Sequence, residues 1–187
     1  MSVTNSKKMQ PESLMMSHGH NPENAENSVK PPIFQTSTFV FESAEQGKRF
    51  FQLAYGLDQA GEGERLGNIY SRVSNPNLEI LEKRLALWDG AEDCAVFSSG
   101  MAAITSAFFE LLKPGDLLLH GAPVYGGTDH FITKMAKHYG IGTLEFKPEE
   151  SEDEIGQRIT GNQGNLIMIY VETPPNPTSA IFDHEMC

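Results

Sequence analysis

The sequence contains 187 residues, of which 39% are hydrophobic and 21% charged, so it can form one ordinary globular domain or one domain with a tail. This composition excludes a collagen-like or a wholly disordered chain. The formal net charge of −11 argues against unspecific binding to nucleic acid or to an anionic membrane. The longest apolar run, Leu166 to Val171, is too short to cross a bilayer, and we expect a cytoplasmic protein.

The first third of the chain predicts little regular structure. Residues 1–32 are polar and rich in Asn, Ser and Pro, so we expect an arm or linker there. Residues 33–41 are β-branched and aromatic, and residues 42–53 carry apolar side chains at helical spacing. The stretch from Gly56 to Gly67 holds four glycines in twelve positions and predicts a loop.

A helix is predicted after Asn75. Asn75 is a good N-cap, Pro76 suits the first helical position, and Gly90 suits the position after the end. Apolar side chains then recur at intervals of three, four and three residues, as they do on one face of a helix: Leu78, Leu81, Leu85 and Trp88.

From residue 94 onward, short apolar runs alternate with helical patterns. The predicted strands are residues 94–97, 117–120, 142–146 and 166–171, and the predicted helices are residues 101–112, 128–139 and 152–159. Strands that are apolar throughout indicate a parallel sheet with helices on both faces. In such α/β folds ligands bind at the carboxyl ends of the strands. Binding or catalytic residues are therefore expected in the loops after Phe97, His120 and Val171.

The segment Ser98-Ser-Gly-Met-Ala-Ala lies between the first predicted strand and its helix. Ser99, Gly100 and Met101 there could form a phosphate cup, because glycine lets the backbone approach an anion and helix N-termini present free N–H groups. The alternative is an ordinary strand-to-helix turn, which also favours Ser and Gly. The chain has no G-x-G-x-x-G motif or P-loop lysine here, so a dinucleotide or a nucleoside triphosphate is a poor candidate.

Three further segments carry polar or aromatic groups. On an extended segment Tyr70 and Arg72 would share one face and could bind phosphate or carboxylate; alternatively they are a surface arginine and an interface tyrosine. Tyr125, followed by two glycines, could lie against a planar ligand, or mark a simple turn. The proline-rich segment after the last strand could fix Glu172 and Asn176, or be an ordinary loop with a capping Asn.

Together these segments resemble a known family. Tyr70-Ser-Arg-x-x-Asn-Pro76 and Glu172-Thr-Pro-x-Asn-Pro177 carry the resemblance, with weaker similarity near His18, residues 29–33 and residues 35–41. The chain is similar over most of its length to the pyridoxal-phosphate enzymes of cysteine and methionine metabolism. These are the transsulfuration enzymes cystathionine γ-synthase, cystathionine γ-lyase and methionine γ-lyase.

The resemblance implies an N-terminal arm and subunit-contact segment at residues 1–66, and at residues 67–187 part of a large domain like that of fold-type I pyridoxal-phosphate enzymes. It implies that the backbone of Gly100 and Met101, with Ser99 nearby, binds the phosphate of the cofactor. Tyr70 and Arg72 would reach that phosphate from a neighbouring subunit of a homo-oligomer, which the resemblance implies to be a homotetramer.

The resemblance also gives roles to three residues at the ring of the cofactor. Tyr125 would be the aromatic platform under the pyridine ring and the one catalytic residue present, because it could assist the γ leaving group. Asn176 would lie near the phenolic oxygen of the ring. Glu172 would be an active-site acid, and its role stays open.

Three groups that the family needs are not found in the sequence. The Schiff-base lysine and the acid that pairs with the pyridine nitrogen follow the Asn-Pro segment in the family, whereas the last lysine here is Lys147 and Asp183 follows too closely. The arginine that binds the substrate carboxylate is missing as well. We therefore expect a fragment of a longer protein, inactive by itself.

The expected parent makes or breaks a C–S bond at the γ-carbon of an amino acid derived from homoserine or cysteine. Its substrate would be a homoserine ester, cystathionine, cysteine or methionine. Gly127, where a methionine γ-lyase would carry cysteine, favours a cystathionine γ-synthase or γ-lyase. O-acylhomoserine sulfhydrylase and methionine γ-lyase are alternatives, as are a non-catalytic truncated homologue and a binding module for a phosphorylated metabolite.

The sequence predicts neither a metal site nor a disulfide framework. His18 and His20 lie in the polar arm without fixed geometry, and the other histidines share no ligand spacing. The two cysteines, Cys94 and Cys187, lack the paired spacing of a zinc site, and Cys94 is expected to be a small buried side chain.

Overall fold

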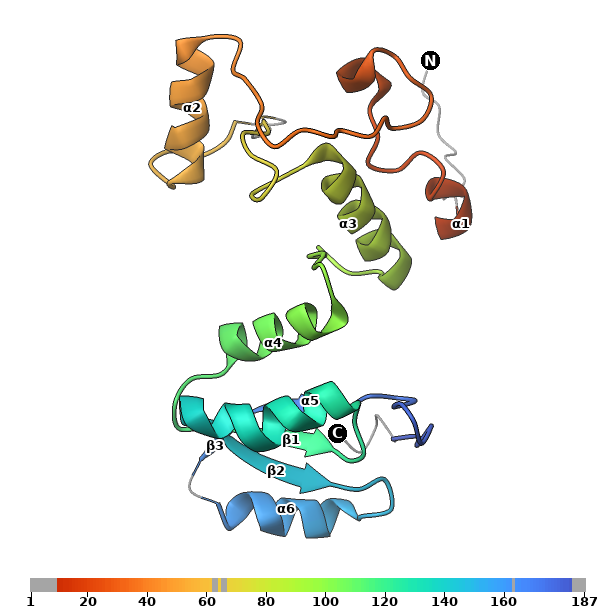
Figure 1. Ribbon diagram of the computed structural model, residues 1–187, viewed down its shortest axis with the longest axis vertical. Helices are drawn as coiled ribbons and strands as arrows, with labels where there is room; N and C mark the ends of the chain where they lie inside the picture. The colour runs from red at the N-terminus through yellow and green to blue at the C-terminus, as the bar shows by residue number, and fades with distance from the viewer. Residues whose placement is uncertain (1–9, 62–63, 65–66, 163, 183–187) are drawn as a thin grey trace, which may run out of the picture. The chain divides into compact units, whose positions relative to one another are not determined.

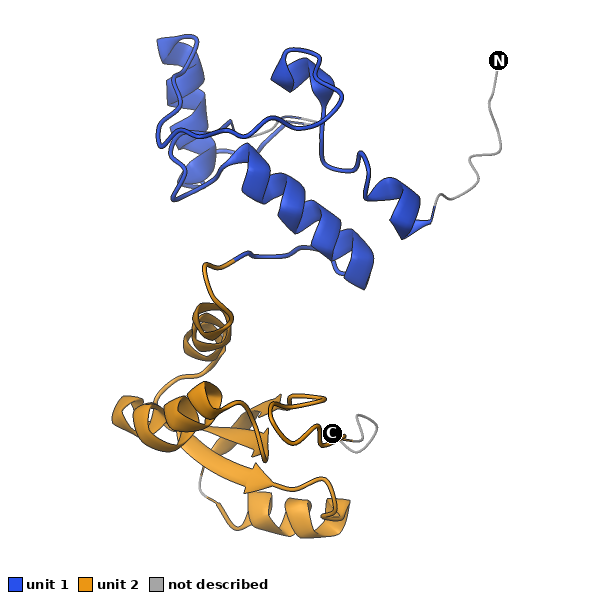
Figure 2. Cartoon of the chain, turned by 45° about the vertical axis from the view of Figure 1, so that its right-hand side comes forward, with its two compact units in different colours: residues 1–96 blue, residues 97–187 orange. Residues whose placement is uncertain are grey.

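The computed structural model describes residues 10–61, 64, 67–162 and 164–182. The chain forms two compact units, Met1–Val96 and Phe97–Cys187, and each is described by itself (Figure 2). This division follows contacts within the chain. The boundary expected between residues 66 and 67 separates a subunit-contact segment from a cofactor-binding domain of a longer protein, and it stays a prediction.

The first unit is organised around α3 (Pro76–Asp89), which confirms the helix predicted there. The Asn75 side chain caps it by accepting a hydrogen bond from the N–H of Asn77, and Gly90 ends it in the left-handed conformation, with φ of 67°. Only a residue without Cβ adopts this conformation at little cost.

The polar arm carries two short helical elements, α1 (Pro11–Leu14) and the 3-10 turn η1 (Pro22–Ala25). It contacts α3: the Arg84 guanidinium donates to the carbonyl of His18 at 3.0 Å, and Ala25 is buried. The described part of the arm expected at residues 1–32 is therefore packed against α3. The polar composition did not indicate this, because the Arg84 contact is made to a main-chain carbonyl.

The predicted helical spacing at residues 42–53 corresponds to α2 (Ala44–Ala54), which is capped by Ser43. Aromatic packing holds α2 to the segment before it, with ring centroids of Phe41 and Phe50 5.5 Å apart. Gly47 makes this possible, because a Cβ there would lie 3.0 Å from the Phe41 ring. In the described part of the glycine-rich loop, Arg49 pairs with Asp58 at 2.5 Å and with Glu64 at 2.7 Å.

The second unit contains a parallel sheet of three strands. Its order is β2 (Gly142–Phe146), β1 (Asp116–Gly121) and β3 (Asn165–Tyr170) (Figure 1). β1 is central and buried along nearly its whole length, whereas β3 alternates between exposed and half-buried residues. The three strands predicted at these positions are confirmed.

Helices cover both faces of this sheet, as predicted. Leu118 packs against Phe108 of α4 (Gly100–Leu111) and against Ile132, while its neighbour Leu119 lies in a separate cluster with Ile155 of α6 (Glu152–Thr160). Successive strand residues point to opposite faces, so one apolar run serves two cores. Figure 1 shows α4 and α5 on one side of the sheet and α6 on the other.

The helix predicted at residues 128–139 is irregular. It starts earlier, as α5 (Gly126–His130), continues through a π-helical turn (Phe131–Met135) and a 3-10 turn (Ala136–Tyr139), and ends at Gly140 with φ of 71°. Its buried face, which includes Phe131 and Ile132, still packs on the sheet.

The strand predicted at residues 94–97 is wrong. This segment has no ladder partner in the described part of the chain, and the Phe97 side chain is 43% exposed. Cys94, expected to be buried, is half-buried. An apolar run becomes a strand only when a neighbouring strand takes up its backbone N–H and C=O groups, whereas here the N–H of Val96 donates to the Glu82 side chain of α3 at 3.1 Å.

Candidate functional site

An open hollow lies where the second unit brings together the N-terminus of α4 and the segments after β1 and β3. Seven residues line it: Ser99, Gly100, Met101, Ile104, Tyr125, Tyr170 and Glu172. Five of these seven were predicted as site residues. The loops after β1 and β3, which contribute to the hollow, were also predicted as locations of the site. Ile104 and Tyr170 were not predicted.

One wall of the hollow is the first turn of α4. Ser99 is the N-cap, and its hydroxyl accepts a hydrogen bond from the N–H of Ala102 at 3.1 Å. The N–H groups of Gly100 and Met101 stand where a helix has no internal acceptor. A Cβ on Gly100 would meet no atom within 4 Å, so space is open beside these N–H groups. This arrangement suits an anion, because the positive end of the helix dipole faces it.

Another wall is Tyr125, whose ring is 47% exposed. Gly127 lies directly behind this ring. A Cβ there would be 2.8 Å from Cε1 of Tyr125 and 3.0 Å from Sδ of Met101. Gly127 therefore makes room for the ring, and the opposite ring face is available to a planar ligand.

Glu172 connects Tyr125 to the rest of the site. One carboxylate oxygen, Oε2, accepts the backbone N–H of Tyr125 at 2.7 Å. The other, Oε1, accepts the hydroxyl of Thr128 at 3.0 Å and that of Tyr170 at 2.8 Å. Burial and the neighbouring Glu172 carboxylate raise the pKa of Tyr170 well above its ordinary value, so this hydroxyl keeps its proton and remains a donor.

Asn176 is not among the residues that line the hollow. It lies exposed in the proline-rich segment after β3, and its predicted role at the cofactor ring stays a prediction. Thr128 and Tyr170 were missed by the sequence reasoning. The signal for Tyr170 was a single aromatic hydroxyl at the end of an otherwise aliphatic strand; Thr128 gave no signal beyond its place after two glycines.

Tyr70 and Arg72 belong to the first unit, and the expected extended segment is wrong for them. The chain turns here, because the N–H groups of Val73 and Ser74 both donate to the carbonyl of Tyr70. The two side chains nevertheless meet, with Cζ of Arg72 5.9 Å from the centre of the Tyr70 ring. A turn, and not strand alternation, brings the cation and the phenol together.

Two asparagines brace this turn. The Asn75 side chain donates to the hydroxyl of Ser71 at 3.1 Å and to the carbonyl of Phe34 at 3.2 Å. Asn77 accepts from the N–H of Phe34 at 2.8 Å and donates to the carbonyl of Pro32 at 2.7 Å. The N-terminus of α3 thus holds residues 32–34 of the arm, and the turn at residues 70–74 forms beside them.

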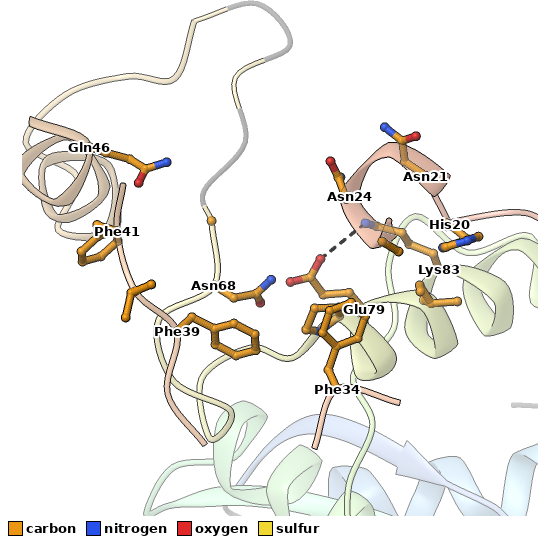
Figure 3. A pocket seen from close by; sticks show the side chains of 16 residues that line it. His20, Asn21, Asn24, Phe34, Phe39, Phe41, Gln46, Asn68, Glu79 and Lys83 are labelled. Carbon is orange, nitrogen blue, oxygen red and sulfur yellow. Dashed lines mark ion pairs between the residues drawn. The ribbon is translucent and has the colours of Figure 1, made fainter. Parts of the chain in front are cut away.

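The first unit has a hollow of its own, about 350 Å³ in volume (Figure 3). It is lined by aromatic and amide side chains and by Glu79 and Lys83, which pair with each other at 3.8 Å. No residue predicted for the site lines it.

Over the described ranges, no group of three or more His, Cys, Asp or Glu side chains could hold a metal ion. Within the same ranges, no helix is both long and apolar enough to span a membrane.

An α/β unit with an anion-accepting helix N-terminus beside an exposed aromatic ring fits proteins that bind a phosphorylated planar cofactor. The chain belongs to the Cys/Met metabolism PLP-dependent enzyme family, whose model matches residues 12–187. This confirms the family resemblance seen in the motifs.

Individual relatives are named for different reactions. The chain is 39% identical over 169 residues to an L-methionine γ-lyase of Porphyromonas gingivalis, covering 89% of this chain and 38% of the relative. It is 32% identical over 174 residues to the sulfhydrylase FUB7 of Gibberella moniliformis, covering 93% and 37%. The chain thus spans about two fifths of the length of these curated relatives.

A solved structure shares the fold. A Campylobacter jejuni protein assigned as O-acetylhomoserine (thiol)-lyase, crystallised with N′-pyridoxyl-lysine-5′-monophosphate, superposes with a TM-score of 0.75 at 31% identity. The match covers 94% of this chain and 40% of that one.

Proposed function

We propose that this chain supplies the phosphate-binding and ring-packing part of a pyridoxal-phosphate enzyme that makes or breaks a C–S bond at the γ-carbon of an amino acid. The observation that carries the proposal is the shared hollow: the first turn of α4 and the exposed ring of Tyr125 both line it. The family match supports the class of cofactor, and sulfur amino acids or homoserine esters are the proposed substrates.

The residues of the hollow fit one part of this cofactor. The N–H groups of Gly100 and Met101, capped by Ser99, would bind the phosphate, and the Tyr125 ring would pack on one face of the pyridine. None of the lining residues is a lysine. The bound cofactor supplies an electron sink for bond cleavage, whereas this chain contributes binding and orientation.

The lysine and the acid that this chemistry needs follow the Asn-Pro segment in the family, and this sequence carries neither there. We therefore propose that the 187-residue chain binds phosphate but does not turn over an amino acid by itself. The Tyr70 and Arg72 pair would serve the phosphate site of another copy of the chain, as the resemblance implies.

A charge placed at Gly100 tests the proposal. In Gly100→Asp a carboxylate stands at the first turn of α4, where it favours the helix but repels a bound phosphate. We expect unchanged or slightly higher thermal stability and at least tenfold weaker binding of pyridoxine 5′-phosphate by isothermal titration. Gly156→Asp is the matched control, since a Cβ there also meets no atom within 4 Å. Equal affinities in both variants would contradict the proposal.

Two kinds of enzyme are candidates for the particular reaction. Gly127 supports a cystathionine γ-synthase or γ-lyase, because a methionine γ-lyase is expected to carry cysteine there. The 39% identity to a methionine γ-lyase supports that enzyme as the second candidate. Assays of a longer protein that contains this chain, with cystathionine, O-acetylhomoserine plus sulfide, and methionine in parallel, would decide between them. Methionine as the best substrate by kcat/KM would overturn the first.

A further inference from the structure

Glu172 accepts hydrogen bonds from three residues, two of which, Tyr125 and Tyr170, line the hollow. These are the backbone N–H of Tyr125, the hydroxyl of Thr128, which is fully buried, and the hydroxyl of Tyr170. Both oxygens of the carboxylate are occupied, so the side chain is tied down by its neighbours. A residue 47 positions away in sequence thereby fixes the main chain at Tyr125.

This contact lies at the start of α5. Tyr125 is the N-cap residue of α5, and its own side chain makes no capping hydrogen bond. Glu172, two residues beyond the end of β3, accepts the N–H of the N-cap residue, as a Glu side chain does in a capping box, and places a negative charge at the helix start.

We propose, resting on the function proposed above, that Glu172 is the positioning residue that sets the Tyr125 ring against the cofactor ring, and that it does not exchange protons with substrate. Its oxygens are held by donors within the protein, and the Tyr170 hydroxyl among them remains protonated. The role of Glu172 is thus exerted through the backbone of Tyr125.

Glu172→Met tests this role with little change in side-chain length. The thioether has no carboxylate oxygen, so the Tyr125 N–H and the two hydroxyls lose their acceptor. Glu150→Met is the matched control, because Glu150 also accepts a backbone N–H, that of Lys147 at 2.8 Å, outside the hollow. Glu172→Asp is the second variant, because the shorter side chain withdraws the carboxylate from the Tyr125 N–H.

Two measurements on the 187-residue chain decide the matter. Amide hydrogen exchange at Tyr125, followed by NMR, should be about tenfold faster in Glu172→Met and unchanged in Glu150→Met, as expected for the loss of one hydrogen bond. Binding of pyridoxine 5′-phosphate should weaken about tenfold in Glu172→Met, whereas binding of inorganic phosphate should stay within twofold, because only the ring ligand contacts Tyr125.

The outcomes separate this inference from the proposed function. Unchanged exchange at Tyr125, or an equal loss for both ligands, would overturn the positioning role. If the wild type binds neither ligand, the proposed function fails, while the exchange rate at Tyr125 still decides the role of Glu172. Should Glu172→Met lose its fold, Glu172→Asp decides: faster exchange at Tyr125 with a selective loss of the ring ligand supports the role, and no change in either measurement overturns it.

Discussion

Gly127 lies against the ring of Tyr125 so closely that a Cβ would stand 2.8 Å from Cε1. Atoms do not approach to this distance without a shift, so the small residue and the ring position depend on each other. The backbone at Gly127 is not in the left-handed region, and the restriction is therefore one of space alone.

Gly127→Cys should displace the ring and lower the free energy of unfolding by about 1–3 kcal/mol, the usual cost of overpacking. Gly126→Cys is the control, because a Cβ there meets nothing within 4 Å. Urea denaturation followed by circular dichroism measures both changes. Similar losses in the two variants would show that Gly127 does not set the ring position.

Removal of the Asn77 side chain should free the arm segment at Phe34. Asn77→Ala loses both hydrogen bonds to the arm, and we expect exchange at the Phe34 amide to rise about tenfold. Asn162→Ala, which removes one hydrogen bond at the end of α6, is the control and should leave Phe34 unchanged. An unaltered Phe34 amide in Asn77→Ala would contradict the bracing role.

The pH dependence of the glycine-rich loop follows from Glu64. Hydrogen bonds from the Arg49 side chain and the Gly61 N–H lower the pKa of Glu64 from 4.5 to about 2. Because the folded value is depressed, the stabilising contact is present above pH 4.5 and is lost as the pH falls toward 2. In Arg49→Gln the carboxyl carbon of Glu64 should titrate closer to 4.5 by NMR. A titration near 2 in that variant would contradict the assignment to Arg49.

Leu118→Ala tests the core of the second unit. Leu118 is fully buried beside Phe108 and Ile132, and its truncation should lower the free energy of unfolding by about 2–5 kcal/mol. Ile169→Ala on β3, where the side chain is 38% exposed, should cost clearly less. Chemical denaturation gives both values, and equal losses would contradict the placement of the core.

Features with local causes could be predicted from the sequence. The helix from Pro76 to Asp89 carries its own cap, first-turn proline and terminal glycine, so its ends follow from neighbouring residues. The same holds for the strand at Leu118, whose apolar run is bounded by turns. The helix start at Gly100 was predictable because its free backbone N–H groups belong to one short segment.

Features that depend on distant partners could not be predicted in this way. Residues 94–97 have the composition of a strand but no described neighbour to pair with. Tyr70 and Arg72 meet in a turn whose middle residue, Ser71, donates hydrogen bonds to the distant carbonyls of Thr36 and Ser37. The role of Glu172 requires knowing that it lies beside the backbone of Tyr125, which the spacing of residues does not reveal.

A residue-resolved titration tests the central claim most directly. Pyridoxine 5′-phosphate added to the ¹⁵N-labelled chain should move the amide resonances of Gly100 and Met101 most strongly, with a smaller change at Tyr125, and inorganic phosphate should move the first two alone. Resonance changes confined to residues outside the first turn of α4, or none at millimolar ligand, would contradict the claim that this helix start binds the phosphate.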